Sequence, residues 1–228
     1  MPLTLAAILM DLPAAVILTA WAAFVTYYIA KKTYDYALRR GRSNNSAVYL
    51  SRKVIHFLAG GLVAFCVPFA FHEPVVPLLI AAILSIAVYM PHRTGKLLYW
   101  FQDPENSYEV DFTIMWGLII FLSWFIDPSF WLGVIPVLFM SWGDGITGVI
   151  RNFVYGKRVK GAYGSLGMLA VTLPIGMTLG YFGALAAVVS TAAEKWGRID
   201  DNLLVPAISF AIILIGYLYF PALSRDLW

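Results

Sequence analysis

Seven apolar runs follow one another along the sequence, and they restrict the possible folds more than any other feature. An apolar helix needs about 20 residues to cross a bilayer, so a series of such runs is typical of a polytopic membrane protein. Several runs are shorter than this, which favours thin or tilted helices around a polar cavity. The runs lie near residues 3–30, 54–71, 75–90, 112–126, 131–150, 166–193 and 203–221.

The composition supports the same fold class. Of the 228 residues, 61% are apolar and 13% are charged, whereas about a quarter of the residues in a soluble domain are charged. We therefore predict one integral membrane domain over 1–228, folded as an all-α bundle of transmembrane helices. The segment 1–30 has no basic start, and we expect a first transmembrane helix there rather than a cleaved signal. Cys66 is the single cysteine, which excludes an intramolecular disulfide and a cysteine metal site.

The charged residues between the apolar runs predict the orientation of the helices. The connection 31–53 holds seven cations and one acid, 91–111 holds two cations and four acids, and 151–165 holds four cations and no acid. The short connections 72–74 and 127–129 hold no Lys or Arg. Because cytoplasmic loops are rich in Lys and Arg, we expect the three long connections in the cytoplasm and both short ones outside. Cations placed this way do not indicate a nucleic-acid partner.

The run 166–193 decides the predicted number of crossings. It forms either one long helix or two short helices that are broken near Gly180. If the chain crosses twice here, 15 of the 16 Lys and Arg residues share one side of the membrane, against 13 if it crosses once. We therefore predict about eight membrane segments with both termini outside, or seven if 166–193 is a single helix.

The stretch "SWGDGITGVIRNFVYGKRVKGAYGS" at 141–165 places polar groups between two apolar runs. An ionised Asp144 at the end of a span is costly unless a cation pairs with it. Mg²⁺ suits this position, because it is usually held by one or two carboxylates together with substrate phosphates. The flanking Gly143 and Gly145 would let the backbone come close to such a ligand.

A basic turn follows in the same stretch. Lys157, Arg158 and Lys160 offer charge to phosphate groups, and Gly164-Ser165 opens the next helix, where free N–H groups suit an anion. Together with Asp144, this predicts a nucleoside triphosphate site. A plainer interpretation remains open, in which the cations satisfy the positive-inside rule and the glycines cap helices. The chain has no Walker pattern and no kinase catalytic loop, so phosphoryl transfer would need another architecture.

A second polar cluster begins the run 54–71. Arg52 and His56 are four residues apart at the start of a helix, so they share a face, and Lys53 lies beside them. Polar side chains at the end of a span are either interface anchors or parts of a site.

A third cluster precedes the last apolar run. Asp200, Asp201 and Asn202 stand directly before a helix, six residues after Glu194. Asp and Asn are good N-caps, so one of the three is expected to be structural. Two adjacent carboxylates at a membrane face still favour a bound cation.

The clusters together resemble one enzyme family. "RKVIH", "GDGITG", "GKRVKGAYGS" and "E(x5)DDNLLVP" occur in this order, and they resemble the family of dolichol kinase, phytol kinase and CTP-dependent diacylglycerol kinase. That family is related more distantly to phosphatidate cytidylyltransferases. The resemblance covers roughly residues 50–221 as a kinase-like core, and the N-terminal helix at 1–30 lies outside it.

The resemblance implies a CTP-dependent kinase that uses Mg²⁺ to phosphorylate a membrane lipid alcohol, of the dolichol or polyprenol type, at the cytoplasmic face. The residues themselves do not favour CTP over ATP. The catalytic residues that it implies are Asp144, His56 and Lys157. The nucleotide-binding residues that it implies are Arg52, Lys53, Gly143, Gly145, Gly156, Arg158, Lys160, Gly164, Ser165 and Asn202. The metal ligands that it implies are Asp144, Asp200, Asp201 and Glu194.

The chain departs from the family pattern at three positions. Tyr163 stands where the family usually has Glu, Thr147 where it often has Ala, and Arg151 where it often has Gly. Either another acid, Glu105 or Glu109, supplies the contact of the missing glutamate, or the substrate differs.

Two other functions remain open from the sequence. A CDP-lipid synthase also uses CTP and Mg²⁺, but there a lipid phosphate attacks the α-phosphorus. A non-enzymatic transporter can carry charged loops, although transporters tend to hold their polar residues near mid-membrane. The lipid alcohol and the oligomeric state also stay open, and the membrane is the plasma membrane in a prokaryote or the endoplasmic reticulum in a eukaryote.

Overall fold

The computed structural model describes residues 5–155, 160–197 and 199–224, and this part of the chain has helices as its regular secondary structure. It contains eight continuous helical segments and a short 3₁₀ turn at Pro221–Leu223, so the predicted all-α class is confirmed. The segments are α1–η1–α2 (Leu5–Phe24, Val25–Ile29, Ala30–Arg39), α3–η2–α4 (Asn44–Val54, Ile55–Gly61, Leu62–Ala70), α5 (Val75–Thr94), α6 (Tyr108–Trp124), α7–η3–α8 (Trp131–Leu138, Phe139–Gly143, Asp144–Tyr155), α9 (Ala162–Met177), α10 (Gly180–Trp196) and α11 (Asp201–Tyr219).

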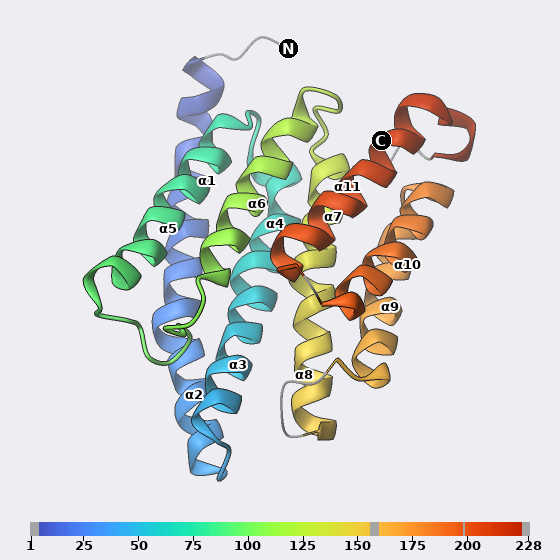
Figure 1. Ribbon diagram of the computed structural model, residues 1–228. Coiled ribbons are helices and arrows are strands. Elements are labelled where there is room, and N and C mark those ends of the chain that lie inside the picture. Colours follow the sequence, from blue (N-terminus) through green and yellow to red (C-terminus); the bar gives the residue numbers. More distant parts are fainter. Residues whose placement is uncertain (1–4, 156–159, 198, 225–228) are drawn as a thin grey trace.

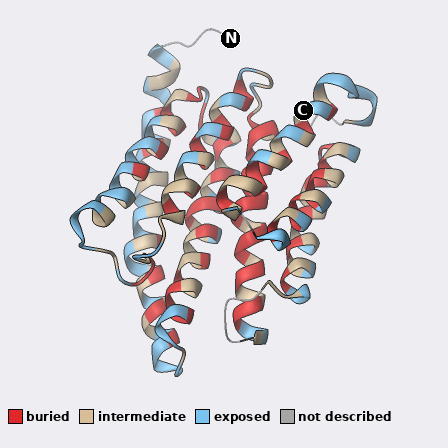
Figure 2. Ribbon diagram, in the orientation of Figure 1, coloured by how far each residue is buried: buried red, intermediate tan, exposed pale blue. Residues whose placement is uncertain are grey.

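Among the described residues, five helices are long and apolar enough to cross a membrane, judged by length and composition. They cover residues 5–39, 44–70, 75–94, 131–155 and 201–219, and α9 is a shorter apolar helix. Large apolar side chains also lie on the outside of the bundle: Ile17, Phe69 and Ile83 are each about two-thirds exposed. Buried residues lie along the inward faces of the helices (Figure 2). The arrangement is compatible with a multi-pass membrane protein.

The helices run up and down the bundle, so that α1 begins and α11 ends at the same end (Figure 1). The connection α2–α3 lies toward the opposite end, where α2, α3 and α8 extend furthest. Helix α10 ends and α11 begins part-way along the bundle, beside α8. The start of α11 therefore lies next to the interior of the bundle rather than at its tip.

The predicted connection 31–53 is mostly helical in the structure. Helix α2 continues the first apolar helix, and α3 leads directly into the next one. The two extensions pack together, with Tyr34 Oη donating to Asn44 Oδ1 at 2.6 Å and Ser51 Oγ donating to the Ala30 carbonyl at 2.8 Å. Hydropathy marks only the apolar part of each helix, because helix-forming polar residues extend it without changing its geometry.

The predicted break in 166–193 is confirmed. Helices α9 and α10 are joined at Thr178 and Leu179, and Gly180 takes a φ of +76° that favours glycine. The two helices pack closely against each other, since a Cβ at Gly176 would lie 2.3 Å from the Gly183 carbonyl oxygen. Glycine at both positions lets the two backbones pack directly.

The helix Asn44–Ala70 contains a π-helical segment, η2 (Ile55–Gly61). A π-helical turn shifts the backbone hydrogen bonds and leaves carbonyls that need other donors. Three indole N–H groups from three other elements supply them: Trp142 donates to Phe57, Trp21 to Leu58 and Trp116 to Gly60, at 2.9–3.1 Å. These contacts hold the segment that carries His56.

Candidate active site

The first part of the site lies where η2 packs against the helix Trp131–Tyr155. Lys53 Nζ hydrogen bonds to Asp144 Oδ2, and His56 Nδ1 lies 3.4 Å from the same oxygen. All three residues are buried. The sequence analysis expected Asp144 after the end of a span and His56 at the start of one. The structure corrects both expectations, because each residue lies inside a continuous helix: His56 lies within the π-helical segment η2, and Asp144 directly follows η3.

The second part joins α8 to α10. Arg151 Nη1 and Nη2 donate to Glu194 Oε1 and Oε2 at 2.6 and 2.9 Å, and both side chains are buried. Two glycines make room for the cations of the site. A Cβ at Gly148 would lie 2.3 Å from Lys53 Cε, and one at Gly164 would lie 2.3 Å from Arg151 Nε.

The third part brings in the start of α11. Lys160 Nζ donates to Glu194 Oε1 at 3.0 Å and to Asp201 Oδ2 at 2.6 Å. Asp144, Glu194 and Asp201 form a group in which one carboxylate oxygen from each lies within 4.8 Å of the others. We call these acids, with Lys53, Arg151 and Lys160, the charged cluster. Helices α3, α8, α10 and α11, together with Lys160 just before α9, thus contribute three acids and three cations to one place.

The acids of the charged cluster fit a divalent cation. Carboxylate oxygens are the ligands that Mg²⁺ prefers, and three within 4.8 Å can approach one ion. Within the described residues, several buried polar atoms here have no hydrogen-bond partner, among them Asp201 Oδ1, Arg151 Nε and Ser165 Oγ. Buried polar groups are normally paired, so these atoms favour a polar ligand between them.

Asp200 is not part of this group. Its side chain caps α11 by accepting from the Asn202 N–H at 3.1 Å, which confirms the expectation that one polar residue before this helix is structural. Burial and the neighbouring Asp111 carboxyl raise the pKa of Asp200 to about 7. Asn202 is buried, and its Nδ2 donates to the Tyr108 carbonyl at 3.1 Å, so it ties α11 to α6.

A separate polar group lies on the other side of η2, around Glu109 in the first turn of α6. His92 Nε2 lies 2.6 Å from Glu109 Oε1, and Gln102 Nε2 donates to the same oxygen at 2.9 Å. Arg52 Nη2 lies 3.6 Å from Glu109 Oε2, while Arg52 Nη1 donates to Asn106 Oδ1 at 3.2 Å. Arg52 therefore belongs to a different environment from Lys53, its neighbour in the sequence.

An elongated apolar groove, with a cavity volume of about 160 Å³, begins at this polar group. It runs between the helix Leu5–Arg39, η2, α5 and α6, and we call it the α1 groove. Its walls are apolar along most of their length, and Arg52, His56 and Glu109 provide polar groups. His56 therefore lines the α1 groove and also lies beside Asp144 of the charged cluster.

A second cavity, of about 440 Å³, is polar. It lies between the start of α3 and the residues 102–104, and Arg52 lines it as well. Ser43, Asn44, Asn45 and Ser46 contribute hydroxyl and amide groups. Such a cavity suits a hydrophilic ligand.

The remaining predicted residues are distributed as follows. Gly143 packs against Thr172 and Gly145 against Phe57, so both approach neighbouring helices rather than lining an open space. Gly164 and Ser165 lie in the first turns of α9, as expected. The predicted Gly156, Lys157 and Arg158 lie outside the described residues.

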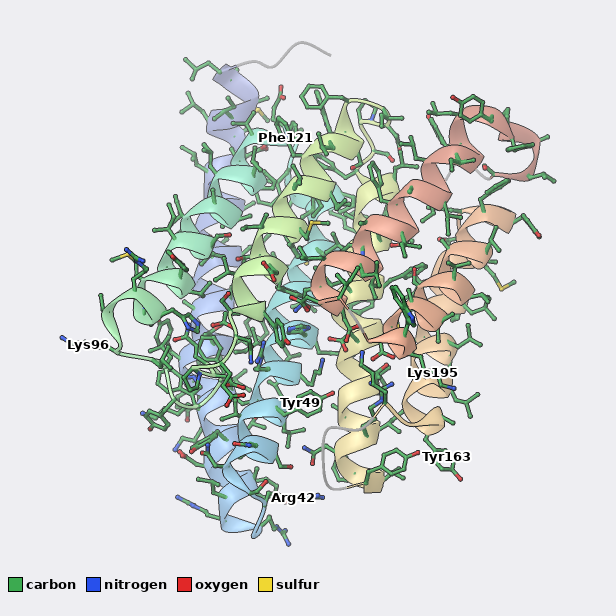
Figure 3. The ribbon with its side chains drawn as sticks, in the orientation of Figure 1. Arg42, Tyr49, Lys96, Phe121, Tyr163 and Lys195 are labelled. Atoms are coloured by element: carbon green, nitrogen blue, oxygen red, sulfur yellow. The ribbon has the colours of Figure 1, made fainter. Side chains whose placement is uncertain are left out.

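The position that departs from the family, Tyr163, points away from the charged cluster (Figure 3). Its side chain is 60% exposed, and its ring lies near that of Tyr155. Glu105 is also exposed, whereas Glu109 is buried beside the α1 groove. Of the two acids considered as replacements for the family glutamate, only Glu109 reaches a cavity in the described structure.

The sequence analysis did not assign Arg151 to the site, although a signal was present. Asp144, Thr147, Gly148 and Arg151 are spaced at intervals of three, one and three residues, so they share one helix face. All four are buried. The helical period across the supposed loop 151–165 would have identified Arg151 as a partner for an acid.

Comparison with known proteins gives one similarity. The chain is similar to an uncharacterized protein of Methanocaldococcus jannaschii, with 27% identity over 177 residues that cover 71% of this chain and 91% of that protein. No family model matches the chain, and no solved structure matches it. The resemblance to the lipid-alcohol kinases therefore stays a prediction from the motifs.

Proposed function

We propose that this chain is a membrane-embedded kinase that transfers the γ-phosphate of a nucleoside triphosphate, CTP by resemblance, to a lipid alcohol at the cytoplasmic face. One observation carries the proposal: His56 lines an apolar groove and lies 3.4 Å from Asp144 of the charged cluster. A lipid hydroxyl in the groove and a phosphate at the cluster would meet at this residue.

The reaction makes two demands that this arrangement meets. The lipid oxygen forms a bond to the γ-phosphorus while the bond from that phosphorus to the bridging oxygen of the nucleotide breaks, and the hydroxyl proton passes to a base. His56 is placed to accept that proton from the groove side, with Asp144 beside it to stabilise the charged imidazolium. Phosphoryl transfer otherwise depends mainly on positioning and charge stabilisation.

The charged cluster would provide that stabilisation. Lys53, Arg151 and Lys160 lie together with the three acids, and such cations stabilise the negative charge that shifts between the phosphate oxygens during transfer. Asp144, Glu194 and Asp201 would hold Mg²⁺, which would neutralise further charge on the phosphates. The polar cavity beside Arg52 offers space for the hydrophilic part of the nucleotide.

The products test the proposal. We would incubate the purified protein in detergent with a panel of lipid alcohols and with CTP labelled at either the α- or the γ-phosphorus. The proposal predicts that the γ label alone enters the lipid, with release of CDP. Entry of the α label into a phospholipid, with release of pyrophosphate, would assign a CDP-lipid synthase instead.

The variant Asp144→Asn provides the control for the site. It keeps the side-chain volume but removes the charge that pairs with Lys53, and we expect about a hundredfold loss of label transfer. A rate within about threefold of the wild type would remove Asp144 from the reaction. Failure of every alcohol in the panel to give labelled lipid would refute the CTP-dependent kinase.

A further inference from the structure

We infer that the α1 groove is the binding site for a long-chain alcohol whose hydroxyl donates a hydrogen bond to Glu109 Oε2. The inference deepens the proposed function, on which it rests, by naming the site of the lipid substrate and the residue that recognises its hydroxyl before transfer. The hydroxyl proton leaves Glu109 and passes to His56 only when the hydroxyl turns toward the phosphate.

The first observation is a carboxylate oxygen without a donor. Within the described residues, Glu109 Oε2 is buried and has no hydrogen-bond partner, although Oε1 of the same group has two. Arg52 Nη2, at 3.6 Å, is too far for a hydrogen bond, and the Arg52 guanidinium also contacts the ring of Tyr108. A buried carboxylate oxygen left this way is costly, so a ligand with a donor is strongly favoured there.

The second observation is where Glu109 lies. Its side chain is 90% buried and lines the α1 groove, whose other walls are mostly apolar. On the helix Asn44–Ala70, the lining residues extend from Arg52 to Val63, or roughly 17 Å at 1.5 Å per residue. A ligand that fits both features has a long apolar body and a hydrogen-bond donor at one end.

The orientation of Glu109 is fixed by its neighbours. Because an ionised carboxylate only accepts, His92 Nε2 and Gln102 Nε2 both donate to Oε1. Gln102 Nε2 also donates to the Val88 carbonyl at 2.7 Å, which ties the residue to α5. These contacts leave Oε2 as the acceptor for the ligand, and they predict a preference for a hydroxyl over an ether.

The wall opposite α6 comes from α1, the helix that lies outside the family resemblance. Leu18, Ala22 and Thr26 line the groove from this side. Asp11 accepts from the His72 and Glu73 backbone N–H groups at 3.0–3.1 Å, and Trp100 Nε1 donates to the Thr26 carbonyl at 2.9 Å. The helix is thus held at both ends of the groove, and it forms part of the lipid site.

Binding without nucleotide tests the inference independently of catalysis. The probes are tritiated geranylgeraniol, a 20-carbon prenol, and its tritiated methyl ether, which cannot donate. The binding is measured with purified wild-type protein in chelator and without nucleotide. We expect the alcohol to bind at least about tenfold more tightly than the ether, because only the alcohol can donate a hydrogen bond to the carboxylate. Equal binding of the two probes would overturn the inference.

Glu109→Gln then gives a change of specificity rather than a simple loss. The amide oxygen should keep the two donors, His92 and Gln102, so the amide NH₂ faces the groove and can donate to an ether or to a hydroxyl oxygen. We expect the preference for the alcohol to fall to about twofold or less, whereas Glu105→Gln at the exposed neighbouring acid keeps it. An unchanged preference in Glu109→Gln would contradict the assignment.

A second pair of variants keeps the test decisive if Glu109→Gln does not fold. Ala22→Phe fills the groove from α1, and Ala20→Phe makes the same change at an exposed position of the same helix that does not line it. Loss of alcohol binding in Ala22→Phe with retention in Ala20→Phe supports the site, and retention in both refutes it. If the alcohol binds but no phosphate is transferred, the result supports the α1 groove as a binding site and refutes the proposed kinase activity.

Discussion

The charged groups on the two sides of the helix Asn44–Ala70 differ in their hydrogen-bond partners. On one side, each acid of the charged cluster is paired with a cation: Lys53 with Asp144, Arg151 with Glu194, and Lys160 with Asp201. On the other side, Glu109 Oε2 lies 3.6 Å from Arg52 but has no hydrogen-bond donor among the described residues, and Glu109 lines an apolar groove. Hydrogen-bonded ion pairs hold helices together, whereas a buried carboxylate oxygen without a donor favours a ligand. The comparison separates a part suited to phosphates from a part suited to a lipid.

Paired charges alone do not prove a catalytic role. Burying an ion pair costs desolvation that the attraction often only offsets, so apolar residues would stabilise the bundle as well. The unpartnered Asp201 Oδ1 and Arg151 Nε indicate that the network is not complete by itself. Variants that remove one partner of a pair therefore separate a structural from a functional role.

The largest effect is expected from breaking the pair between Arg151 and Glu194. Glu194→Gln leaves two cations, Arg151 and Lys160, without the charge that they contact, and we expect a loss of about 3–5 kcal/mol in the free energy of unfolding. The double variant Arg151→Met, Glu194→Leu should regain most of this stability but not the transfer of phosphate. Chemical unfolding in detergent gives the first quantity, and label transfer gives the second. Recovery of activity in the double variant would show that the pair is only structural.

Adjacent aspartates offer the next test. Asp201 joins the charged cluster, whereas Asp200 caps α11. We expect Asp201→Asn to lower the turnover rate about a hundredfold, since a ligand of the proposed Mg²⁺ is lost and with it part of the charge stabilisation of the phosphates. Asp200→Asn should change it less than about threefold, because Asn also caps helices well. Equal losses in both variants would contradict the assignment of Asp201.

The π-helical segment that carries His56 can be tested through its indole donors. Trp116→Phe removes the hydrogen bond to the Gly60 carbonyl, which should cost about 1–3 kcal/mol of stability because a buried acceptor loses its partner. Trp124→Phe on the same helix is the matched control, since within the described residues the buried Trp124 Nε1 has no partner. A comparable loss in both variants would attribute the effect to ring packing instead.

The smallest expected effect is a pH dependence of stability. The pKa of Asp200 is raised to about 7, against about 3.9 in an unfolded chain. The folded protein therefore binds more protons between these values, and its free energy of unfolding should fall by about 1–2 kcal/mol as the pH rises from 4 to 7. Unfolding of chelator-treated protein measures this, and Asp200→Asn should flatten the dependence. Asp35→Asn on the surface of α2 should not.

The sequence predicted the all-α class, the break near Gly180 and the acids that meet in the charged cluster. These features depend on local patterns, such as apolar length, a turn glycine and carboxylates at the ends of apolar runs. The helical extensions and Arg151 were missed, because the analysis treated polar stretches as loops and did not follow the helical period across them.

The pairing of residues across the bundle was the least predictable part. Lys53 and Arg52 are neighbours in the sequence but contact Asp144 and Asn106, in separate environments. Gly143 and Gly145 were expected to approach a ligand, whereas they pack against Thr172 and Phe57 of neighbouring helices. Such contacts depend on how helices pack against one another, and one sequence carries little information about that.

The central claim is that the α1 groove delivers a lipid hydroxyl to the charged cluster. The most direct measurement is kcat/KM for γ-phosphate transfer to prenols of increasing chain length, compared between Ala22→Phe and Ala20→Phe in the same detergent. The account predicts that kcat/KM rises with chain length in Ala20→Phe, because each buried methylene contributes about 0.8 kcal/mol, and that the rise is lost in Ala22→Phe. The same chain-length dependence in both variants would contradict it.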